Sequence, residues 1–103
     1  MKERLTNRLL DFQKKLRCIS AYNHENGSAL FKYSIEFECL LSILTRINHQ
    51  EFGAIANNYT RGTQRYCELG CELSDETNRE KAFSAGKNEL DIYVNKCLRI
   101  LAG

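Results

Sequence analysis

The sequence has 103 residues and carries a net charge of only +2, with 43 % hydrophobic and 27 % charged residues. This balance excludes a largely disordered chain and predicts one globular domain, residues 1–103, with a single core. Proline is absent and only six glycines occur, which favours long uninterrupted helices over a turn-rich all-β fold.

The apolar segments are too short for a membrane span. The longest, CLLSIL, is far below the roughly 20 residues that cross a bilayer, and the N-terminal MKERLTNRLLDFQKK has no signal-peptide core. We therefore expect a cytoplasmic protein that does not contact membranes and whose five cysteines are reduced thiols.

The first predicted helix covers about residues 2–22. Its apolar residues alternate between spacings of three and four, as on one face of a helix packed in a bundle. They are Leu5, Leu9, Phe12, Leu16 and Ile19. The segment NHENGS then supplies turn residues, and Ser28 is placed to cap the next helix.

The second predicted helix covers about residues 29–47 and repeats the same spacing. Its apolar series is Leu30, Tyr33, Phe37, Leu40, Leu44 and Ile47. We expect a break at Asn48, which can cap a new helix with Glu51 at the reciprocal position of a capping box. Because neither glycine nor proline marks this break, the alternative is one long helix whose core is completed by dimerisation.

The third and fourth predicted helices cover about residues 50–73 and 78–101. The third series is Phe52, Ile55, Tyr59, Gly62, Tyr66, Leu69 and Leu73, and the fourth is Phe83, Gly86, Leu90, Tyr93, Val94, Cys97, Ile100 and Leu101. Thr77 and Glu80 form a second capping box before the fourth helix. Four amphipathic helices with short connections predict an all-α protein, an antiparallel up-down four-helix bundle that homodimerisation could complete.

The two closest cysteines, Cys67 and Cys71, raise the question of a metal or redox site. On a straight helix they lie to one side of the large apolar residues, on a stripe of small residues that lets a neighbouring helix approach. A metal site would need ligands from other helices, among them Cys18, Cys39, Cys97, His24 and His49. We predict that both cysteines serve packing, and we expect neither a metal nor a cofactor.

His49 is followed four residues later by Gly53, a pair that resembles the phosphorylation site of histidine phosphotransfer domains. The resemblance covers these two residues only. It would imply a lysine three positions after the histidine, where this chain has Phe52. We therefore expect His49 to be a solvent-exposed residue at a helix end.

The second helix carries a further apolar face, opposite its core series. It consists of Phe31, Ile35, Cys39 and Ile43, with Lys32, Glu36, Glu38 and Arg46 between or beside the two faces. Exposed apolar surface usually marks an interface. We predict an intermolecular interface here, and the alternative is coverage by another part of the same chain.

No catalytic constellation stands out, so the sequence predicts a non-catalytic protein-interaction module rather than an enzyme. It would act as an adaptor, inhibitor, immunity protein or chaperone and bind a protein partner or itself through this face. The alternative is nucleic-acid binding by the first helix, because residues 1–22 hold six of the 15 Lys and Arg residues but only two of the 13 acids. Its basic face is Arg4, Arg8, Lys14, Lys15 and Arg17.

Overall fold

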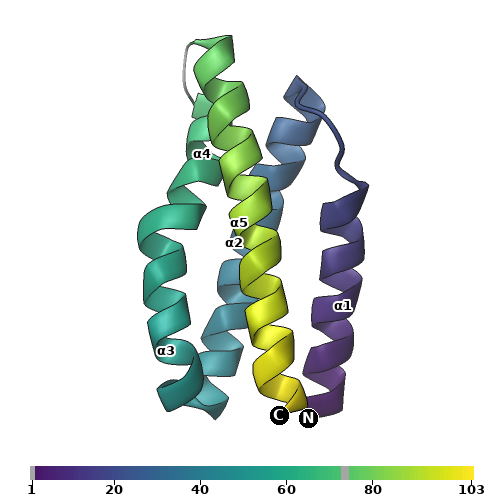
Figure 1. Cartoon of the computed structure of the whole chain (residues 1–103), viewed down its shortest axis with the longest axis vertical. Helices are drawn as coiled ribbons and strands as arrows, with labels where there is room; N and C mark the ends of the chain where they lie inside the picture. The colour runs from purple at the N-terminus through teal and green to yellow at the C-terminus, as the bar shows by residue number, and fades with distance from the viewer. Residues whose placement is uncertain (1, 73–74) are drawn as a thin grey trace.

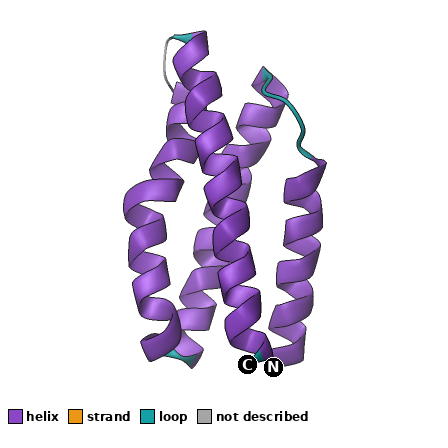
Figure 2. Cartoon of the chain, viewed as in Figure 1, coloured by secondary structure: helices purple, strands orange, loops and turns teal. Residues whose placement is uncertain are grey.

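The computed structural model describes residues 2–72 and 75–103, and every regular element in these residues is a helix (Figure 2). The elements are α1 (Lys2–Cys18), α2 (His24–Ile47), α3 (His49–Asn58), the π-helical turn η1 (Tyr59–Thr63), α4 (Gln64–Glu72) and α5 (Glu76–Ala102). Because α3, η1 and α4 follow one another without a gap, the described chain forms four helices. The predicted all-α class is confirmed.

The four helices form a compact globule. The radius of gyration is 13.6 Å, close to the value of about 13 Å expected for a folded chain of 100 residues. The two termini lie at the same end of the molecule, and α2 lies between α1 on one side and the α3–α4 helix on the other (Figure 1). Within the described residues, none of the helices is long and apolar enough to cross a membrane.

The first connection lies about five residues earlier than predicted. Helix α1 ends at Cys18 and α2 begins at His24, so the predicted turn segment NHENGS is mostly helical. Asn23, not Ser28, is the N-cap, and its side-chain oxygen accepts a hydrogen bond from the Asn26 amide at 2.7 Å. The glycine of that segment, Gly27, is buried within α2, and its carbonyl oxygen accepts a hydrogen bond from the Cys71 thiol of α4.

The break at Asn48 is confirmed. Helix α2 ends at Ile47, and the Asn48 side chain accepts a hydrogen bond from the Glu51 amide at 3.2 Å. The alternative of one continuous helix is therefore wrong. At the start of α5, the predicted cap Thr77 is wrong: Asp75 is the N-cap and accepts from the Thr77 amide at 3.1 Å.

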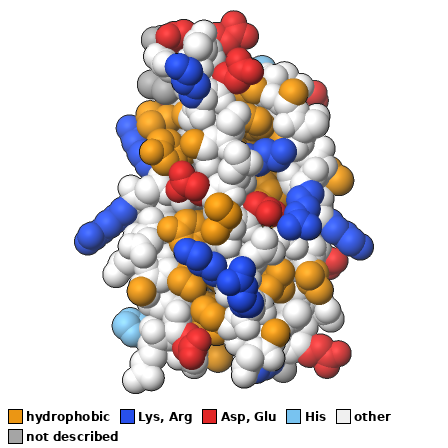
Figure 3. All heavy atoms as spheres, viewed as in Figure 1, with side chains coloured by type: hydrophobic (Ala, Val, Ile, Leu, Met, Phe, Trp, Pro, Cys, Tyr) orange, Lys and Arg blue, Asp and Glu red, His pale blue; other side chains and the backbone are white. Residues whose placement is uncertain are grey.

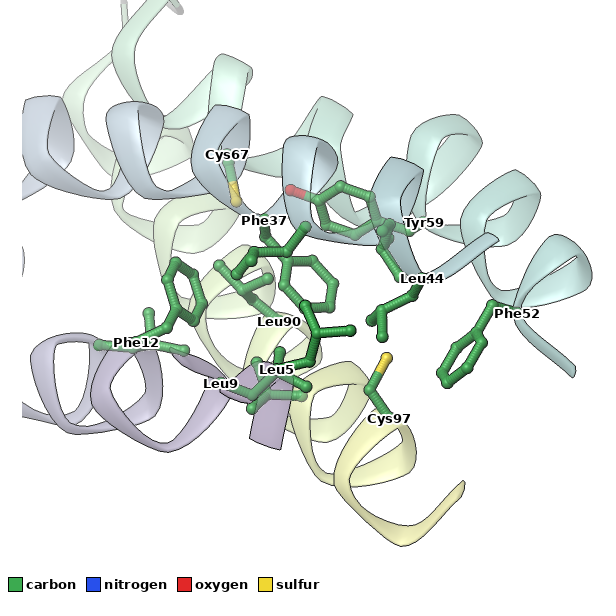
Figure 4. Packing of buried hydrophobic residues seen from close by; sticks show 14 of the residues in the cluster. Leu5, Leu9, Phe12, Phe37, Leu44, Phe52, Tyr59, Cys67, Leu90 and Cys97 are labelled. Atoms are coloured by element: carbon green, nitrogen blue, oxygen red, sulfur yellow. The ribbon is translucent and has the colours of Figure 1, made fainter. Parts of the chain in front are cut away.

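The core is built around stacked and edge-on aromatic rings. Phe37 lies between Phe12 and Tyr59, at ring-centroid distances of 5.6 and 5.0 Å (Figure 4). The Tyr59 hydroxyl is fully buried and donates a hydrogen bond to the Ser34 carbonyl oxygen at 2.5 Å, which satisfies its polar end. The described members of the predicted series in α1, α2 and α5 are buried or half-buried, except Ile47, which is 51 % exposed.

The predicted core series of the third helix is wrong beyond Tyr59. Tyr66 is 41 % exposed and Gly62 and Leu69 are half-buried, while three residues one position later are buried. These are Thr63, Cys67 and Gly70. The last predicted member, Leu73, lies outside the described residues.

The π-helical turn explains this shift. In η1 the Gln64 amide donates to the Tyr59 carbonyl, five residues back instead of four. A π turn therefore holds one extra residue, and everything after it is rotated by about 100° relative to a straight α-helix. The residues that face the core are displaced by one position.

The close contact between α4 and α5 accounts for the register that the chain adopts. A Cβ atom on Gly86 would lie 2.9 Å from the Cys67 sulfur and 3.1 Å from the Cys67 amide nitrogen. A Cβ atom on Gly70 would lie 3.3 Å from the Phe83 Cα. On α4 this contact has room only for the small side chains of Cys67 and Gly70. The register of a straight helix would place the larger Tyr66 and Leu69 at these positions.

The glycines at positions 62 and 86 should respond to alanine in opposite directions. Gly62→Ala should stabilise the protein by about 0.5–1 kcal/mol, because no described atom obstructs its Cβ within 4 Å and glycine is unfavourable in a helix. Gly86→Ala should destabilise it. Overpacking typically costs about 1–3 kcal/mol, which exceeds the stabilisation gained by replacing a helical glycine with alanine. Urea denaturation measures both, and equal stability of the two variants would contradict the close α4–α5 contact.

Candidate functional site

The second apolar face of α2 is only partly covered in the folded chain. We call Phe31, Ile35, Cys39 and Ile43 the α2 stripe. Ile35 is 46 % exposed, Cys39 is exposed, and the two outer members, Phe31 and Ile43, are half-buried. Coverage by the same chain, the alternative reading of this face, therefore applies only to the two ends of the stripe.

Helix α1 lies along one side of the α2 stripe. Lys15 of α1 forms an ion pair with Glu36 of α2 at 3.7 Å, and the Phe12 ring packs edge-on against Tyr33 at 6.0 Å. Residues four apart share a helix face, so Lys32 points to the same side as Glu36. This side of the stripe is the α1 flank.

Helix α4 lies along the other side. The Gln64 amide of α4 donates to the Glu38 carboxylate of α2 at 2.5 Å, and the Cys71 thiol donates to the Gly27 carbonyl at 3.0 Å. Glu68, four residues after Gln64, shares the face that looks toward α2. This side of the stripe is the α4 flank.

The predicted basic face of α1 is exposed but does not act as one free cationic surface. The side chains of Arg4, Arg8, Lys14, Lys15 and Arg17 are all exposed. However, Arg17 forks onto Asp91 of α5 at 3.1 and 3.3 Å, and Lys15 is paired with Glu36. The Asp91 carboxylate raises the pKa of Arg17 through its hydrogen bond and its charge. Two of the five cations are thus engaged within the chain.

The predicted packing role fits Cys67, which is buried, but not Cys71, which is exposed. Cys67 and Cys97 are fully buried, and desolvation raises the pKa of each thiol to about 12 (Figure 4). For Cys71, partial burial and the neighbouring Glu72 also raise the pKa. A reactive cysteine needs the opposite shift. In the part of the chain that the structure describes, no group of three His, Cys, Asp or Glu side chains could hold a metal ion.

His49 is the first residue of α3 and is exposed, as expected for a residue at a helix end. Its imidazole lies against Gly53, where an added Cβ would approach the ring to 3.3 Å. Phe52 is buried in the core and offers no cation.

One apolar hollow was not predicted from the sequence. It lies where the start of α1 and the ends of α2 and α5 meet, and its volume is about 320 Å³. Its lining is Lys2, Leu5, Ile47, Asn48, Phe52, Ile100 and Leu101. The only sequence signal was Ile47, the last member of a core series, because a core residue at a helix end has fewer neighbours.

Outside the α2 stripe and this hollow, the exposed large apolar residues of the described chain are Leu10, Tyr66 and Ile92, each on a different helix. Ile92 of α5 is 53 % exposed, and the face that carries α5 mixes hydrophobic side chains with both signs of charge (Figure 3). Such single residues are normal on a protein surface and mark no site. The α2 stripe differs because its members follow one another at every fourth residue.

Comparison with protein-family models, with curated proteins and with solved structures gives no match for this chain.

Proposed function

We propose that this chain is a non-catalytic protein-interaction module that binds a protein partner or itself through the α2 stripe. An adaptor, inhibitor, immunity or chaperone-like role would each use such a surface. The observation that carries the proposal is the exposure of Ile35 and Cys39 in the middle of an otherwise apolar run. When a partner covers such aligned apolar groups, the free energy of the complex falls by roughly 25 cal/mol for each Å² of apolar surface removed from water.

The proposal includes an antiparallel up-down arrangement of the helices. Two contacts between α2 and α4 support this arrangement, because the residue number rises along α2 while it falls along α4. Along α2, contacts to α4 pass from Gly27 with Cys71 to Glu38 with Gln64. In this arrangement α2 has α1 and α4 beside it and its outer side remains available to another protein.

The surface charge favours a protein partner over nucleic acid. A nucleic-acid site gains affinity from cations that neutralise phosphates, and it is usually strongly basic. Here Lys15 and Arg17 are already paired with acids of the same chain. Arg4, Arg8 and Lys14 remain available to steer an acidic protein electrostatically.

A matched pair of substitutions tests the proposal. Ile35→Asp places a charge in the α2 stripe, whereas Ile92→Asp places one at an isolated isoleucine of similar exposure on α5. The protein, immobilised in a lysate of its own source cells, should retain a partner or further copies of itself. We expect Ile35→Asp to reduce the retained amount by at least about tenfold and Ile92→Asp to leave it unchanged.

Circular dichroism provides the control, because both variants should keep the helical spectrum of the parent. Equal retention by the two variants would contradict the proposed function, as would the absence of any specifically retained protein. Unfolding of Ile35→Asp alone would do so as well, since it would show that Ile35 belongs to the core.

A further inference from the structure

The two flanks of the α2 stripe carry opposite charge. The α4 flank carries three acidic residues, Glu38, Glu68 and Glu72. The Arg65 guanidinium on this flank forms ion pairs with Glu68 at 3.1 Å and with Glu72 at 3.8 Å. Burial raises the pKa of Tyr59, and the charges of Glu38 and Glu68 raise it further. The α4 flank therefore has an excess of negative charge.

The α1 flank has an excess of positive charge. Lys32 lies on α2 itself, and α1 contributes Arg4, Arg8 and Lys15. Glu36 neutralises Lys15 at 3.7 Å, and Asp11 lies in the same row of α1. Glu25 of α2, seven residues before Lys32, shares the same side, so the three remaining cations outnumber the two remaining acids on this flank.

This polarity distinguishes the two ways in which a second copy could pack on the stripe. If two α2 helices meet face to face in antiparallel orientation, two-fold symmetry brings each flank against the same flank of the other copy. Like charges then meet. If the helices are parallel, with the two-fold axis along them, the α1 flank of each copy meets the α4 flank of the other, and opposite charges meet.

The levels of the charged residues along α2 fit the parallel arrangement. Contacts of Gln64 with Glu38 and of Cys71 with Gly27 show that Glu68 lies at a level between them, within about one helical turn of Lys32. In a parallel pair the two-fold axis runs along the helices, so every residue lies at the same height along the axis as the equivalent residue of the second copy. Lys32 of one copy therefore lies opposite Glu68 of the other.

We propose that the α2 stripe binds the α2 stripe of a second copy of this chain, with the two α2 helices parallel and related by a two-fold axis. Ile35 and Cys39 lie next to the axis, and the Lys32 and Glu68 pairs lie on either side. Arg46 follows the last residue of the stripe and would lie near Arg46 of the second copy. Because these like charges repel, the two helices diverge toward that end. This inference rests on the proposed function and names the partner.

Sedimentation equilibrium under reducing conditions tests the inference directly. A single-helix contact is small, so we expect a monomer–dimer equilibrium with a midpoint in the micromolar range, observable from roughly 10 to 500 µM protein. A pure monomer across this range would overturn the inference. If such a monomer still retained a different protein through Ile35, the proposed function would stand.

Charge reversal tests the parallel orientation. Lys32→Glu and Glu68→Lys should each weaken dimerisation by about tenfold, since each places like charges at two contacts. A mixture of the two variants should dimerise like the parent, because both contacts in the mixed dimer join opposite charges. Lys81→Glu, at an exposed position on α5, is the control and should have no effect.

The alternatives give different results in the same experiment. In an antiparallel dimer Lys32 meets the cationic flank, so Lys32→Glu would strengthen association and overturn the proposed arrangement. Failure of the mixed variants to recover would also overturn it, because the pairing of Lys32 with Glu68 would then be absent.

Discussion

Deletion of Arg61 should leave the protein folded, whereas deletion of Asn88 should unfold it. Arg61 is an exposed residue of the π-helical turn η1, which already contains one residue more than an α-helix needs. Without it, Thr63, Cys67 and Gly70 follow Tyr59 at spacings of three and four and keep facing the core. We expect a cost of about 1–2 kcal/mol, within the range of an ordinary substitution.

Asn88 is the matched control because it is also an exposed helical residue. It lies in α5 between Gly86 and Leu90, where no extra residue is present. Its deletion rotates one half of α5 by about 100° and removes either Phe83 and Gly86 or Leu90 and Val94 from the core. The cost should exceed most of the roughly 5–15 kcal/mol that stabilises a small domain. Thermal unfolding monitored by circular dichroism measures both, and equal loss of structure would contradict the register shift at η1.

The protein should lose stability steeply between about pH 9 and pH 12. The buried thiols of Cys67 and Cys97 have a pKa raised to about 12, whereas an unfolded thiol ionises near pH 8.5–9. Between these values the unfolded chain releases protons that the folded chain keeps, so the free energy of unfolding falls as the pH rises. The slope is about 1.4 kcal/mol per pH unit for each thiol. Burial also raises the pKa of Tyr59, which adds to the loss at higher pH.

Urea denaturation at pH 8, 9, 10 and 11 in the presence of a reductant measures this slope. The double variant Cys67→Ala and Cys97→Ala should be less stable at pH 8, because two sulfur atoms leave the core, but its stability should depend less on pH. Cys18→Ala removes an exposed thiol and should leave the slope unchanged. If the parent and the double variant had the same slope, buried thiols would not control the alkaline behaviour.

The sequence was sufficient for the helices whose apolar residues keep one strict period. The series in α1 and α5 was predicted residue by residue, since each side chain of that series has a core to face. Asn48 was identified from its capping chemistry, which depends only on neighbours within three residues. The same signal placed the caps of α2 and α5 wrongly at Ser28 and Thr77, so a capping residue alone does not determine where a helix begins.

The π turn and the first connection could not be predicted in this way because they depend on distant residues. The straight-helix series through Tyr66 and Leu69 was a better apolar pattern than the real one. The chain nevertheless adopts the register of Cys67 and Gly70, because α5 approaches too closely for larger side chains. Similarly, Gly27 resembled a turn residue, but it lies within α2, where its carbonyl oxygen accepts a hydrogen bond from Cys71, 44 positions later.

The candidate site was likewise predictable where it depends on helical periodicity and not where it depends on contacts between helices. The run from Phe31 to Ile43 followed from helical periodicity, but its degree of exposure required the positions of α1 and α4. The basic face of α1 could be listed from the sequence, whereas the pairing of Arg17 with Asp91 joins residues 74 positions apart. The opposite charge of the two flanks became evident only when Glu68 was placed beside α2.

The most direct measurement of the central claim, that the α2 stripe is an occupied binding surface, is the labelling of Cys39 in living cells. Cys18 is the internal reference, because both thiols are exposed in the folded chain. A membrane-permeant maleimide, followed by mass spectrometry, gives the ratio of modification at the two positions. We predict that Cys39 is protected relative to Cys18 in cells and that this protection disappears in the dilute purified protein. Equal labelling of the two cysteines in cells would contradict the account.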